Sequence, residues 1–460
     1  MSDRTRRPIT RRAFVGAAST AFALTVVPSR VLGQDAPGNK LNIAAIGAGG
    51  RAWADLRRVE SENIVALCDV DLEQGKKGID KHPEAKVYRD FRVMLDEMEK
   101  DIDAVIVATP DHTHYVAAMA AMERGKHVYC EKPLAHSIYE ARKLTEAARE
   151  HKVVTQMGNQ GHSAENIRLC CEAIWDGAIG EVREINAWSN RPHGGYSFPV
   201  AMRRPEETPP VPETLNWDLW LGPAADRPYH PAYCPRYWRG WLDFGTGALG
   251  DYGCHTLDPA FWALKLGAPT SVEANTTHFE PEVAAETYPV ASIIRYEFPA
   301  RGDLPPIKLT WFDGGLLPPR PEAHPQHKGF GGNGAFIIGD KGVIMHGSHG
   351  AGGCKILPDH KLEEHEPPPR VLDRVEGGKD GHQQDWVRAC KGGKPASGNF
   401  DYGGPLTEVV LLGVIAMRIR NEKLLWDAER MEFAKSDEAN ELVKPTYRDV
   451  VLMRYFSDLP

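Results

Sequence analysis

The sequence predicts an α/β protein with an N-terminal, doubly wound parallel sheet and a C-terminal α+β domain that has an open, mostly antiparallel sheet. From residue 40 to about residue 154, apolar strand runs alternate with helical patterns, as a parallel sheet covered by helices requires. A glycine-rich turn follows the first of these runs. Beyond residue 154, short strand runs are separated by glycine- and proline-rich segments, which favours an antiparallel or mixed sheet. The N-terminal part therefore has the pattern of a Rossmann domain.

The elements of the parallel sheet follow from short apolar runs rich in Ile, Val and Ala. Strands are expected at 41–46, 64–68, 102–108 and 127–130. Helices are expected between them, notably over 89–100, 114–124 and 138–151. We expect this nucleotide-binding domain to cover residues 38–155.

The second domain is expected to cover residues 156–430, followed by a C-terminal extension over 431–460. Helices are expected at 164–175 and 406–420, strands at 184–190, 271–279, 290–298, 307–312, 335–338 and 342–345, and loops at 314–334, 347–353 and 367–369. Ten prolines lie between residues 192 and 235. That segment is therefore expected to be irregular and to pack over a site or a partner.

Residues 1–36 predict a removable export signal and a linker. An arginine pair, Arg11-Arg12, stands two positions before Phe14, and residues 13–27 form a stretch of 15 uncharged residues. This stretch is shorter than the roughly 20 residues that span a bilayer, and the arginine pair is typical of twin-arginine signals. We therefore expect the twin-arginine translocation machinery as a partner, a periplasmic or extracytoplasmic location, and no permanent membrane anchor.

The composition is that of an ordinary globular enzyme. The net charge is −8 and no long basic run follows the signal, which argues against nucleic-acid binding. Eight cysteines show neither metal-site spacing nor a dense disulfide pattern, so most are expected to be small buried residues. No metal site is predicted.

The glycine-rich turn is a candidate dinucleotide site. Gly47 permits the tight turn between strand and helix, Gly49 allows backbone amides to approach a pyrophosphate, and Gly50 and Arg51 complete the loop. Asp69 stands 22 positions after Gly47, at the end of the second strand, where a carboxylate can accept hydrogen bonds from ribose hydroxyls. Because a carboxylate there would repel a 2′-phosphate, NAD is favoured over NADP.

The segment after the strand at 102–108 is a second candidate for cofactor binding. Thr109, Pro110, His112 and His114 lie where the strand ends, at the sheet edge that binds ligands in open α/β folds. Two histidines beside an aspartate could also suggest a metal, but their spacing fits no closed metal site well.

Lys132, Asp251 and His255 are candidates for catalysis. Lys132 follows the strand at 127–130 and reaches the same edge, although a surface lysine before a proline is the simpler interpretation. Glu131 and Lys132 are also candidates for cofactor binding. Asp251 and His255 are four positions apart and share one face of a helix. A neutral histidine can take a hydroxyl proton, and a nearby carboxylate can orient it or bind a substrate hydroxyl. The alternative is an ordinary helix with a buried, hydrogen-bonded histidine.

Aromatic residues gather between residues 216 and 262, where five of the eleven tryptophans lie. Aromatic faces beside polar groups suit the C–H faces and hydroxyls of a sugar. Trp238 and Arg239 are candidate substrate contacts on this ground. The simpler interpretation, packing beneath the proline-rich segment, is expected for at least half of these tryptophans.

Taken in order, the glycine-rich loop, the Thr109-Pro110 turn, the Glu131-Lys132-Pro133 segment and the Asp251–His255 pair resemble the Gfo/Idh/MocA family of sugar and cyclitol oxidoreductases. The resemblance runs from about residue 40 to residue 427. It implies that Lys132 contacts nicotinamide ribose and substrate, that His255 is the acid/base, and that Asp251 binds substrate. It also implies a homo-oligomer, dimer or tetramer, formed through the open sheet.

The segment 157–162, which includes Gln160, resembles the family's strand end near the cofactor and also a branch of the family that carries twin-arginine signals. We therefore expect a nicotinamide-dependent oxidoreductase that acts on a secondary alcohol of a sugar, cyclitol or glycoside. Because free NAD is scarce outside the cytoplasm, the cofactor is expected to be tightly held. The alternative is an NAD-dependent glycoside hydrolase or lyase that uses transient oxidation without net redox. A third possibility is a sugar-binding protein without catalysis.

Overall fold

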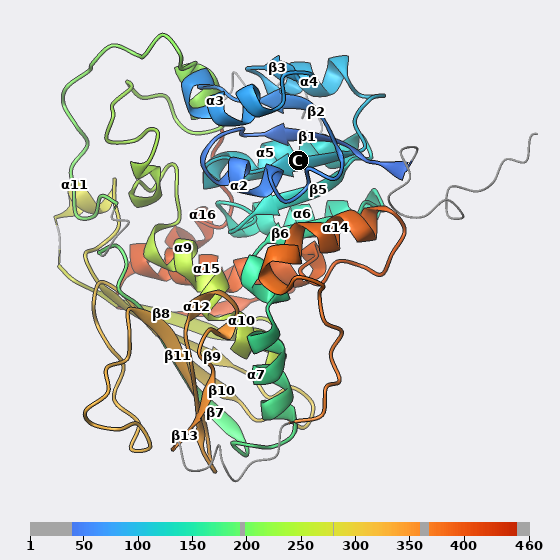
Figure 1. Ribbon diagram of the computed structural model, residues 1–460. Helices are drawn as coiled ribbons and strands as arrows, with labels where there is room; N and C mark the ends of the chain where they lie inside the picture. Colours follow the sequence, from blue (N-terminus) through green and yellow to red (C-terminus); the bar gives the residue numbers. More distant parts are fainter. Residues whose placement is uncertain (1–38, 194–197, 279, 359–367, 449–460) are drawn as a thin grey trace, which may run out of the picture. The chain divides into compact units, whose positions relative to one another are not determined.

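Two β-sheets organise the residues that the computed structural model describes, which are 39–193, 198–278, 280–358 and 368–448. The first sheet has six strands and the second has nine, and Figure 1 shows the first in blue to cyan. The predicted export signal at 1–36 lies outside the described residues, as do residues 449–460 of the predicted extension.

The first sheet confirms the doubly wound prediction. Its strands are β1 (Asn42–Ile46), β2 (Asn63–Cys68), β3 (Lys86–Tyr88), β4 (Ala104–Val107), β5 (His127–Glu131) and β6 (Thr155–Gly158), and its helices are α2 (Gly50–Leu56), α3 (Leu72–Lys81), α4 (Phe91–Glu97), α5 (Asp111–Glu123) and α6 (Ile138–Glu150). All neighbouring strands are parallel, in the order β3-β2-β1-β4-β5-β6. The order reverses between β1 and β4, the point where ligands of such sheets bind.

Each sheet draws on distant parts of the chain. The predicted boundary after residue 155 falls inside β6, which pairs with β5. Helix α14 (His382–Cys390), orange in Figure 1, returns to the first sheet. There Trp386 and Val387 pack with Ile43 and Ile106. In the sequence, α14 begins more than two hundred residues after β6, the last strand of the sheet that it covers.

The second sheet is mixed and mostly antiparallel, as predicted. Its strands are β7 (Val182–Ser189), β8 (Ser271–Thr276), β9 (Ser292–Phe298), β10 (Ile307–Phe312), β11 (Asn333–Gly339), β12 (Val343–His346), β13 (Lys355–Leu357), β14 (Lys423–Asp427) and β15 (Glu432–Ala434). Only β7 and β10 pair in parallel among its described strands. The strands β13, β14 and β15 were not expected from the sequence, because runs of three to five residues carry little periodicity.

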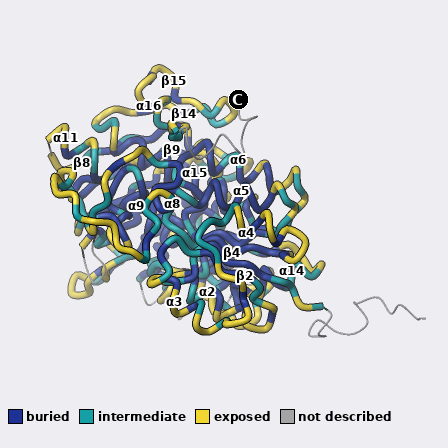
Figure 2. Tube along the Cα trace, turned by 90° about the horizontal axis from the view of Figure 1, so that it is seen from above, coloured by how far each residue is buried: buried dark blue, intermediate teal, exposed yellow. Residues whose placement is uncertain are grey.

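Helices α9 (Gly247–Thr256), α12 (Ser348–Ala351) and α15 (Phe400–Ile419) pack on strands of this sheet. The other helices outside the first sheet are α7 (Glu165–Trp175), α8 (Trp217–Leu221), α10 (Asp258–Ala263), α11 (Pro281–Ala284) and α16 (Asp437–Glu441), with 3-10 turns η3 (Gln160–Ser163), η4 (Tyr237–Gly240) and η5 (Gly378–Gly381). Helix α15 packs against α6, α9 and β8 and is largely dark blue, or buried, in Figure 2.

Helix α15 is long and apolar enough to cross a membrane by length and composition alone, but 78% of its apolar window is buried inside the protein. A core helix has these properties. Every cysteine is a free thiol, and six of the eight are buried, as expected for small core residues.

The opposite face of the second sheet is partly covered by the chain itself. Phe330 packs on Trp188 and Phe336, with ring centroids 5.4 and 5.0 Å away. Farther along, β8 and β9 present Glu273 and Arg295, which lie 4.0 Å apart. This face is therefore partly self-covered and partly charged, and a homo-oligomer through it remains a prediction.

Candidate active site

The glycine-rich loop lies against two neighbouring backbone segments. Gly47 has φ +88°, and a Cβ there would lie 2.8 Å from the carbonyl oxygen of Ala108. A Cβ on Gly49 would lie 2.0 Å from the carbonyl oxygen of Gln74. Only glycine fits at either position, and the loop consequently presents its backbone at the carboxyl end of β1, where the strand order reverses.

Asp69 is tied directly to this loop. Its Oδ2 accepts a hydrogen bond from the Ala48 N–H at 3.0 Å, and its Oδ1 accepts one from the Asp71 N–H at 3.0 Å. Burial raises the pKa of Asp69, while these N–H donors oppose the rise. The sequence prediction placed Asp69 beside the loop, and the structure brings the two together.

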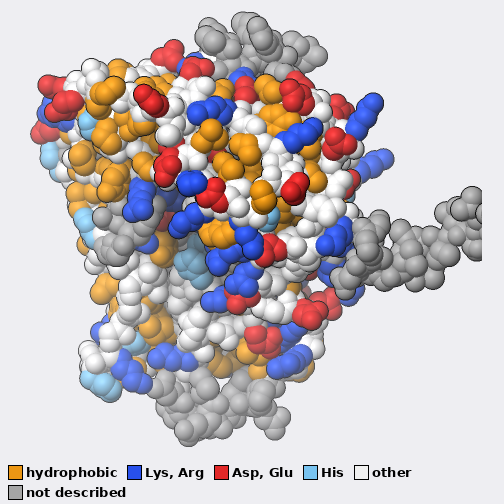
Figure 3. Space-filling view, turned by 45° about the horizontal axis from the view of Figure 1, so that its top comes forward, with side chains coloured by type: hydrophobic (Ala, Val, Ile, Leu, Met, Phe, Trp, Pro, Cys, Tyr) orange, Lys and Arg blue, Asp and Glu red, His pale blue; other side chains and the backbone are white. Residues whose placement is uncertain are grey.

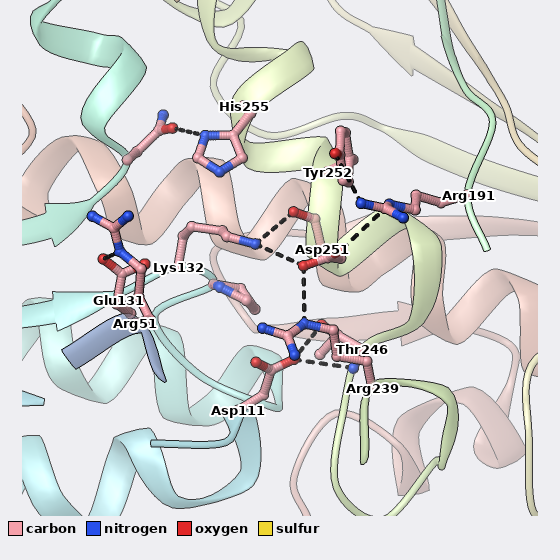
Figure 4. Close-up of polar contacts among 12 residues, drawn as sticks. Arg51, Asp111, Glu131, Lys132, Arg191, Arg239, Thr246, Asp251, Tyr252 and His255 are labelled. Atoms are coloured by element: carbon pink, nitrogen blue, oxygen red, sulfur yellow. Dashed lines mark hydrogen bonds and ion pairs between the residues drawn. The ribbon is translucent and has the colours of Figure 1, made fainter. Parts of the chain in front are cut away.

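Glu131 joins two other residues predicted to bind the cofactor, Arg51 and Gln160. Its Oε1 lies 3.1 Å from Nε of Arg51 and 2.7 Å from Nε2 of Gln160. Arg51 also pairs with the buried Asp55 at 2.6 Å. The start of α2, the end of β5 and the turn η3 therefore meet at one carboxylate, which Figure 4 shows beside Lys132.

The segment from Thr109 to His114 is hydrogen-bonded to α8 and to the residue before α9. Both ring nitrogens of His112 face carbonyl oxygens, at 3.0 Å from Trp220 and 3.3 Å from Phe244. Burial lowers the pKa of His112 to about 3, so the ring is neutral and its proton is best placed toward the nearer oxygen. His114 lies 2.8 Å from the carbonyl oxygens of both Thr109 and Pro133.

These contacts place His112 and His114 in packing positions, where their ring nitrogens are engaged by the protein. The neighbouring Asp111 accepts hydrogen bonds from the hydroxyl and N–H of Thr246, at 2.6 and 3.1 Å. Thr246 directly precedes α9. Pro110 directly precedes α5. The segment thus positions α9 and the chain around Lys132, and cofactor binding by its residues stays a prediction.

Lys132 and Asp251 form the centre of the site. Lys132 Nζ donates to Asp251 Oδ1 at 2.9 Å and to the Asp251 carbonyl oxygen at 2.6 Å. The two side chains are 12% and 10% exposed, which makes this ion pair nearly buried. Figure 4 shows Lys132 reaching from the end of β5 to α9. The surface-lysine interpretation of Lys132 is therefore excluded.

Asp251 has two further cationic neighbours. Arg239 Nε lies 3.1 Å from Oδ1, and Arg191 Nε lies 3.9 Å from Oδ2. Burial by itself raises the pKa of Asp251, but the charges of Lys132 and then Arg239 outweigh it and the net shift is downward. Asp251 is therefore an anionic hydrogen-bond acceptor in the site.

Trp238 lies beneath Arg239 rather than open to the site. The Arg239 guanidinium carbon lies 4.1 Å from the centroid of a Trp238 ring, and Trp238 is only 7% exposed. The other tryptophans Trp217, Trp220 and Trp241 pack into one cluster with Tyr233. The simpler interpretation, that the tryptophans pack in the protein interior, therefore holds for these three. The ring of Trp238 instead packs against the guanidinium group of Arg239.

His255 lies next to this ion-pair cluster with one nitrogen bonded and its ring face covered. Nδ1 lies 2.5 Å from Oδ1 of Asn159. The ring stacks on His349 with centroids 3.8 Å apart and planes 23° apart. Burial, and then His349 and Lys132, lower the pKa of His255 well below the ordinary value. A neutral imidazole is the form that can accept a proton.

Asn159 and His349 are the residues that sequence reasoning missed. Gly161 follows Asn159 in η3, and a Cβ on Gly161 would lie 2.4 Å from the backbone nitrogen of Gly350. Gly161 and Gly350 let η3 and the His349 segment touch. The available sequence signal for this contact was a glycine next to a histidine in each segment. Figure 3 shows Lys and Arg side chains around a recess in which a histidine is exposed.

No group of three or more His, Cys, Asp or Glu side chains in the described part of the chain is arranged to hold a metal. The site instead combines a dinucleotide-type loop with Lys132, Asp251 and His255, which is the arrangement of an NAD-binding oxidoreductase.

Comparison with known proteins supports that class. The Gfo/Idh/MocA profile "Oxidoreductase family, NAD-binding Rossmann fold" matches residues 41–159. The profile of the family's "C-terminal alpha/beta domain" matches residues 194–296. Two models of the Gfo/Idh/MocA oxidoreductases therefore match this chain, one in each of its two regions.

Two curated relatives indicate the chemistry found within this family. A D-glucoside 3-dehydrogenase of Escherichia coli is 27% identical over 240 residues, which cover 51% of this chain and 57% of that protein. A levoglucosan dehydrogenase of Pseudarthrobacter phenanthrenivorans is 32% identical over 198 residues, covering 42% and 40%. The chain thus spans about half the length of the curated relatives it matches.

Solved structures share the fold. An inositol dehydrogenase homolog from Azotobacter vinelandii, crystallised with NAD+, superposes with a TM-score of 0.57 at 17% identity. The match covers 84% of this chain and 97% of that one. Both sheets therefore belong to one shared architecture.

Proposed function

We propose that this protein is an NAD-dependent oxidoreductase acting on a secondary alcohol of a sugar, cyclitol or glycoside. The observation that carries the proposal is the convergence of Lys132, Asp251 and His255 beside the loop formed by Gly47 to Arg51. A nearly buried ammonium, an anionic carboxylate and a neutral imidazole lie within one cluster. Such a set binds a hydroxyl group and removes its proton.

The loop residues fit a dinucleotide. Side chains at Gly47 and Gly49 would collide with neighbouring carbonyls, so the backbone there can lie close to a pyrophosphate. Asp69 keeps a carboxylate beside the loop. There it would accept hydrogen bonds from ribose hydroxyls and would repel the negative charge of a 2′-phosphate. When bound, NAD supplies the hydride acceptor. Lys132, Glu131 and Gln160 would line its nicotinamide end.

The protein's own residues handle the substrate's proton and oxygen. His255 has Nδ1 bonded to Asn159, which leaves Nε2 to take the proton of the reacting hydroxyl. Asp251 would accept a hydrogen bond from a neighbouring hydroxyl. Lys132 would donate to the reacting oxygen and stabilise negative charge that develops on it. Arg239, held over Trp238, would donate to another substrate oxygen.

The substrate class is supported by the relatives, whose names specify a D-glucoside and levoglucosan. We further propose that the protein is exported through the twin-arginine pathway with NAD already bound. A cofactor that cannot exchange with a cytoplasmic pool must be held tightly. A second substrate must then reoxidise it, or the reaction must return it to its starting state.

The test begins with the full chain purified in NAD-free buffer. Denaturation and mass spectrometry should release NAD rather than NADP. Methyl β-D-glucoside, levoglucosan and myo-inositol are then supplied with an artificial electron acceptor. Lys132→Ala and His255→Ala are expected to lower kcat/KM by about 100-fold or more, whereas exposed Lys76→Ala should not change it. A protein that neither contains nor binds NAD would refute the proposal.

The same assay separates the alternative reaction. A glycoside that is cleaved without net NADH, with deuterium taken up from solvent beside the oxidised carbon, would assign transient oxidation. Net formation of a keto sugar would assign the dehydrogenase. Binding of these sugars with no change in cofactor absorbance would instead favour a non-catalytic protein.

A further inference from the structure

Asn159 occupies a buried position between His255 and Asp258. Its side chain has no solvent exposure and makes three hydrogen bonds, two to residues of α9 and one to the first residue of α10. A buried amide with all of these partners has a defined orientation.

The partners of the amide nitrogen determine which atom faces His255. Asn159 Nδ2 lies 2.9 Å from the Cys254 carbonyl oxygen and 3.0 Å from Asp258 Oδ2. Both are acceptors, so both require N–H donors. The amide oxygen therefore faces His255, and because an amide oxygen can only accept, Nδ1 of His255 must carry the proton.

Asp258 is held in place by further contacts. Its Oδ1 accepts the Tyr402 hydroxyl at 2.5 Å and lies 2.9 Å from Nδ1 of His162. His162 is buried, Asp258 itself has no exposure, and Tyr402 is partly buried. The orientation of Asn159 is consequently imposed by a network that extends from η3 to α15.

We propose that Asn159 is a positioning residue that fixes His255 in its Nδ1–H tautomer and leaves Nε2 as the nitrogen that exchanges protons with substrate. The tautomer follows from the contacts alone. Its catalytic consequence rests on the proposed function. An amide, unlike a carboxylate, orients the ring without stabilising an imidazolium, so His255 is neutral before it takes the substrate's proton. Because Nδ1 already carries a proton held by Asn159, the proton that Nε2 takes must also leave from Nε2.

The charged and titratable groups that face His255 act in the same direction. His349 of α12, Lys132 after β5, Arg51 of α2 and His382 of α14 all disfavour a second proton on the ring. Asp258 is the carboxylate that Asn159 contacts, and Asn159 bonds both it and His255. Asn159 thus separates the negative charge from the proposed base.

The tautomer can be measured without a substrate. The full chain is labelled with 15N-histidine, and long-range 1H–15N spectra are compared with those of His255→Gln to assign the His255 signals. A pyrrole-type Nδ1 and a pyridine-type Nε2 at pH 7 are expected. An Nε2–H tautomer would overturn the proposal. Loss of NAD binding or of turnover would bear on the proposed function and leave this readout unaffected.

A charge-exchange variant tests the role of the amide. Asn159→Asp combined with Asp258→Asn keeps the two side-chain shapes and moves the carboxylate next to His255. The pH midpoint for protonation of His255 is expected to rise by more than one unit, because a carboxylate stabilises imidazolium. Asp258→Asn alone, which retains Asn159 and brings no carboxylate to His255, should not raise the midpoint. An unchanged midpoint in the double variant would refute the proposed role.

Folding of each variant is checked by near-UV circular dichroism. Should the exchange fail to fold, Asn159→Ser is the second variant, because a hydroxyl can either donate or accept. It should yield a mixture of the two His255 tautomers. A single Nδ1–H tautomer in Asn159→Ser would show that Asn159 does not impose the proton position.

Discussion

The imidazole of His349 stacks on that of His255, with ring centroids 3.8 Å apart. The two residues lie on α12 and α9, more than ninety positions apart in the chain. His349 has φ +57°, a left-handed conformation that is uncommon for residues other than glycine. Neighbouring contacts, including the close approach of Gly161 and Gly350, hold it there. Two stacked imidazoles cannot both be protonated without strong repulsion.

Replacing His349 should therefore make His255 easier to protonate. In His349→Phe the stacked face is retained and the competing titratable group is lost, so the pKa of His255 should rise by about one unit. The pH midpoint of its 15N signals measures this. The acid limb of kcat/KM should move to higher pH, because neutral His255 is the proposed base. A midpoint that stays in place would show that His349 contributes packing alone.

The ion pair of Lys132 and Asp251 should behave as a coupled unit in stability. Asp251→Asn leaves Lys132, Arg239 and Arg191 around a neutral amide, which should cost about 3 to 5 kcal/mol. Lys132→Met in the same chain removes one of these cations. The double variant should be more stable than the sum of the single changes predicts, with a coupling of about 1 to 3 kcal/mol. Urea unfolding measures all four proteins, and additive effects would contradict the coupling.

The first sheet and its glycine-rich turn could be predicted because their signals are local. Apolar strand runs, a turn that needs glycine and a carboxylate at a strand end all lie within a few residues of one another. The pairing of Lys132 with Asp251 could be expected only from the order of motifs in the family. Short strands such as β3 and β14 have too few residues to show a period.

The rest depends on contacts between distant segments. His112 was predicted to bind the cofactor because it follows a strand end, but nothing in its neighbourhood shows that Trp220 and Phe244 supply carbonyl partners for its ring. His349 reaches the site through the contact of two glycine backbones. Trp386 returns to the first sheet from a helix late in the chain. Sequence spacing does not encode such pairings without a known fold.

The loop glycines should differ sharply in what they tolerate. A Cβ on Gly49 would lie 2.0 Å from the Gln74 carbonyl oxygen, whereas one on Gly50 meets no atom within 4 Å. Gly49→Ala is therefore expected to destabilise the protein by about 3 kcal/mol and to abolish NAD retention. Gly50→Ala carries only the cost of φ +50°, about 1 to 2 kcal/mol.

Thermal unfolding and the NAD content of the purified proteins distinguish the two glycine variants. Gly50→Ala serves as the matched control, because it adds the same methyl group one residue away. Equal losses of stability and of NAD content in both variants would show that the close packing of the loop on α3 is not the reason why position 49 requires glycine.

Asp313 should make the protein less stable as the pH rises from about 4 to 6. Its carboxylate is buried and accepts hydrogen bonds from Ser292 and Trp311, and burial raises its pKa to about 6. Between the unfolded value of about 3.8 and 6, the folded state binds more protons than the unfolded state. Its contribution to stability is therefore fully present below about pH 4 and declines by about 3 kcal/mol as the pH reaches 6.

Asp313→Asn removes this titration, so the difference in unfolding free energy between the two proteins should change with pH below 6 and be constant above it. Urea unfolding at several pH values measures the difference, in which other groups cancel. Ser292→Ala removes the hydroxyl donor 2.9 Å from Oδ1 and should raise the pKa of Asp313 further, which extends the slope above pH 6. A difference independent of pH would mean that Asp313 has the same pKa in the folded and unfolded states. Any pH dependence of the unfolding free energy would then have to come from other groups.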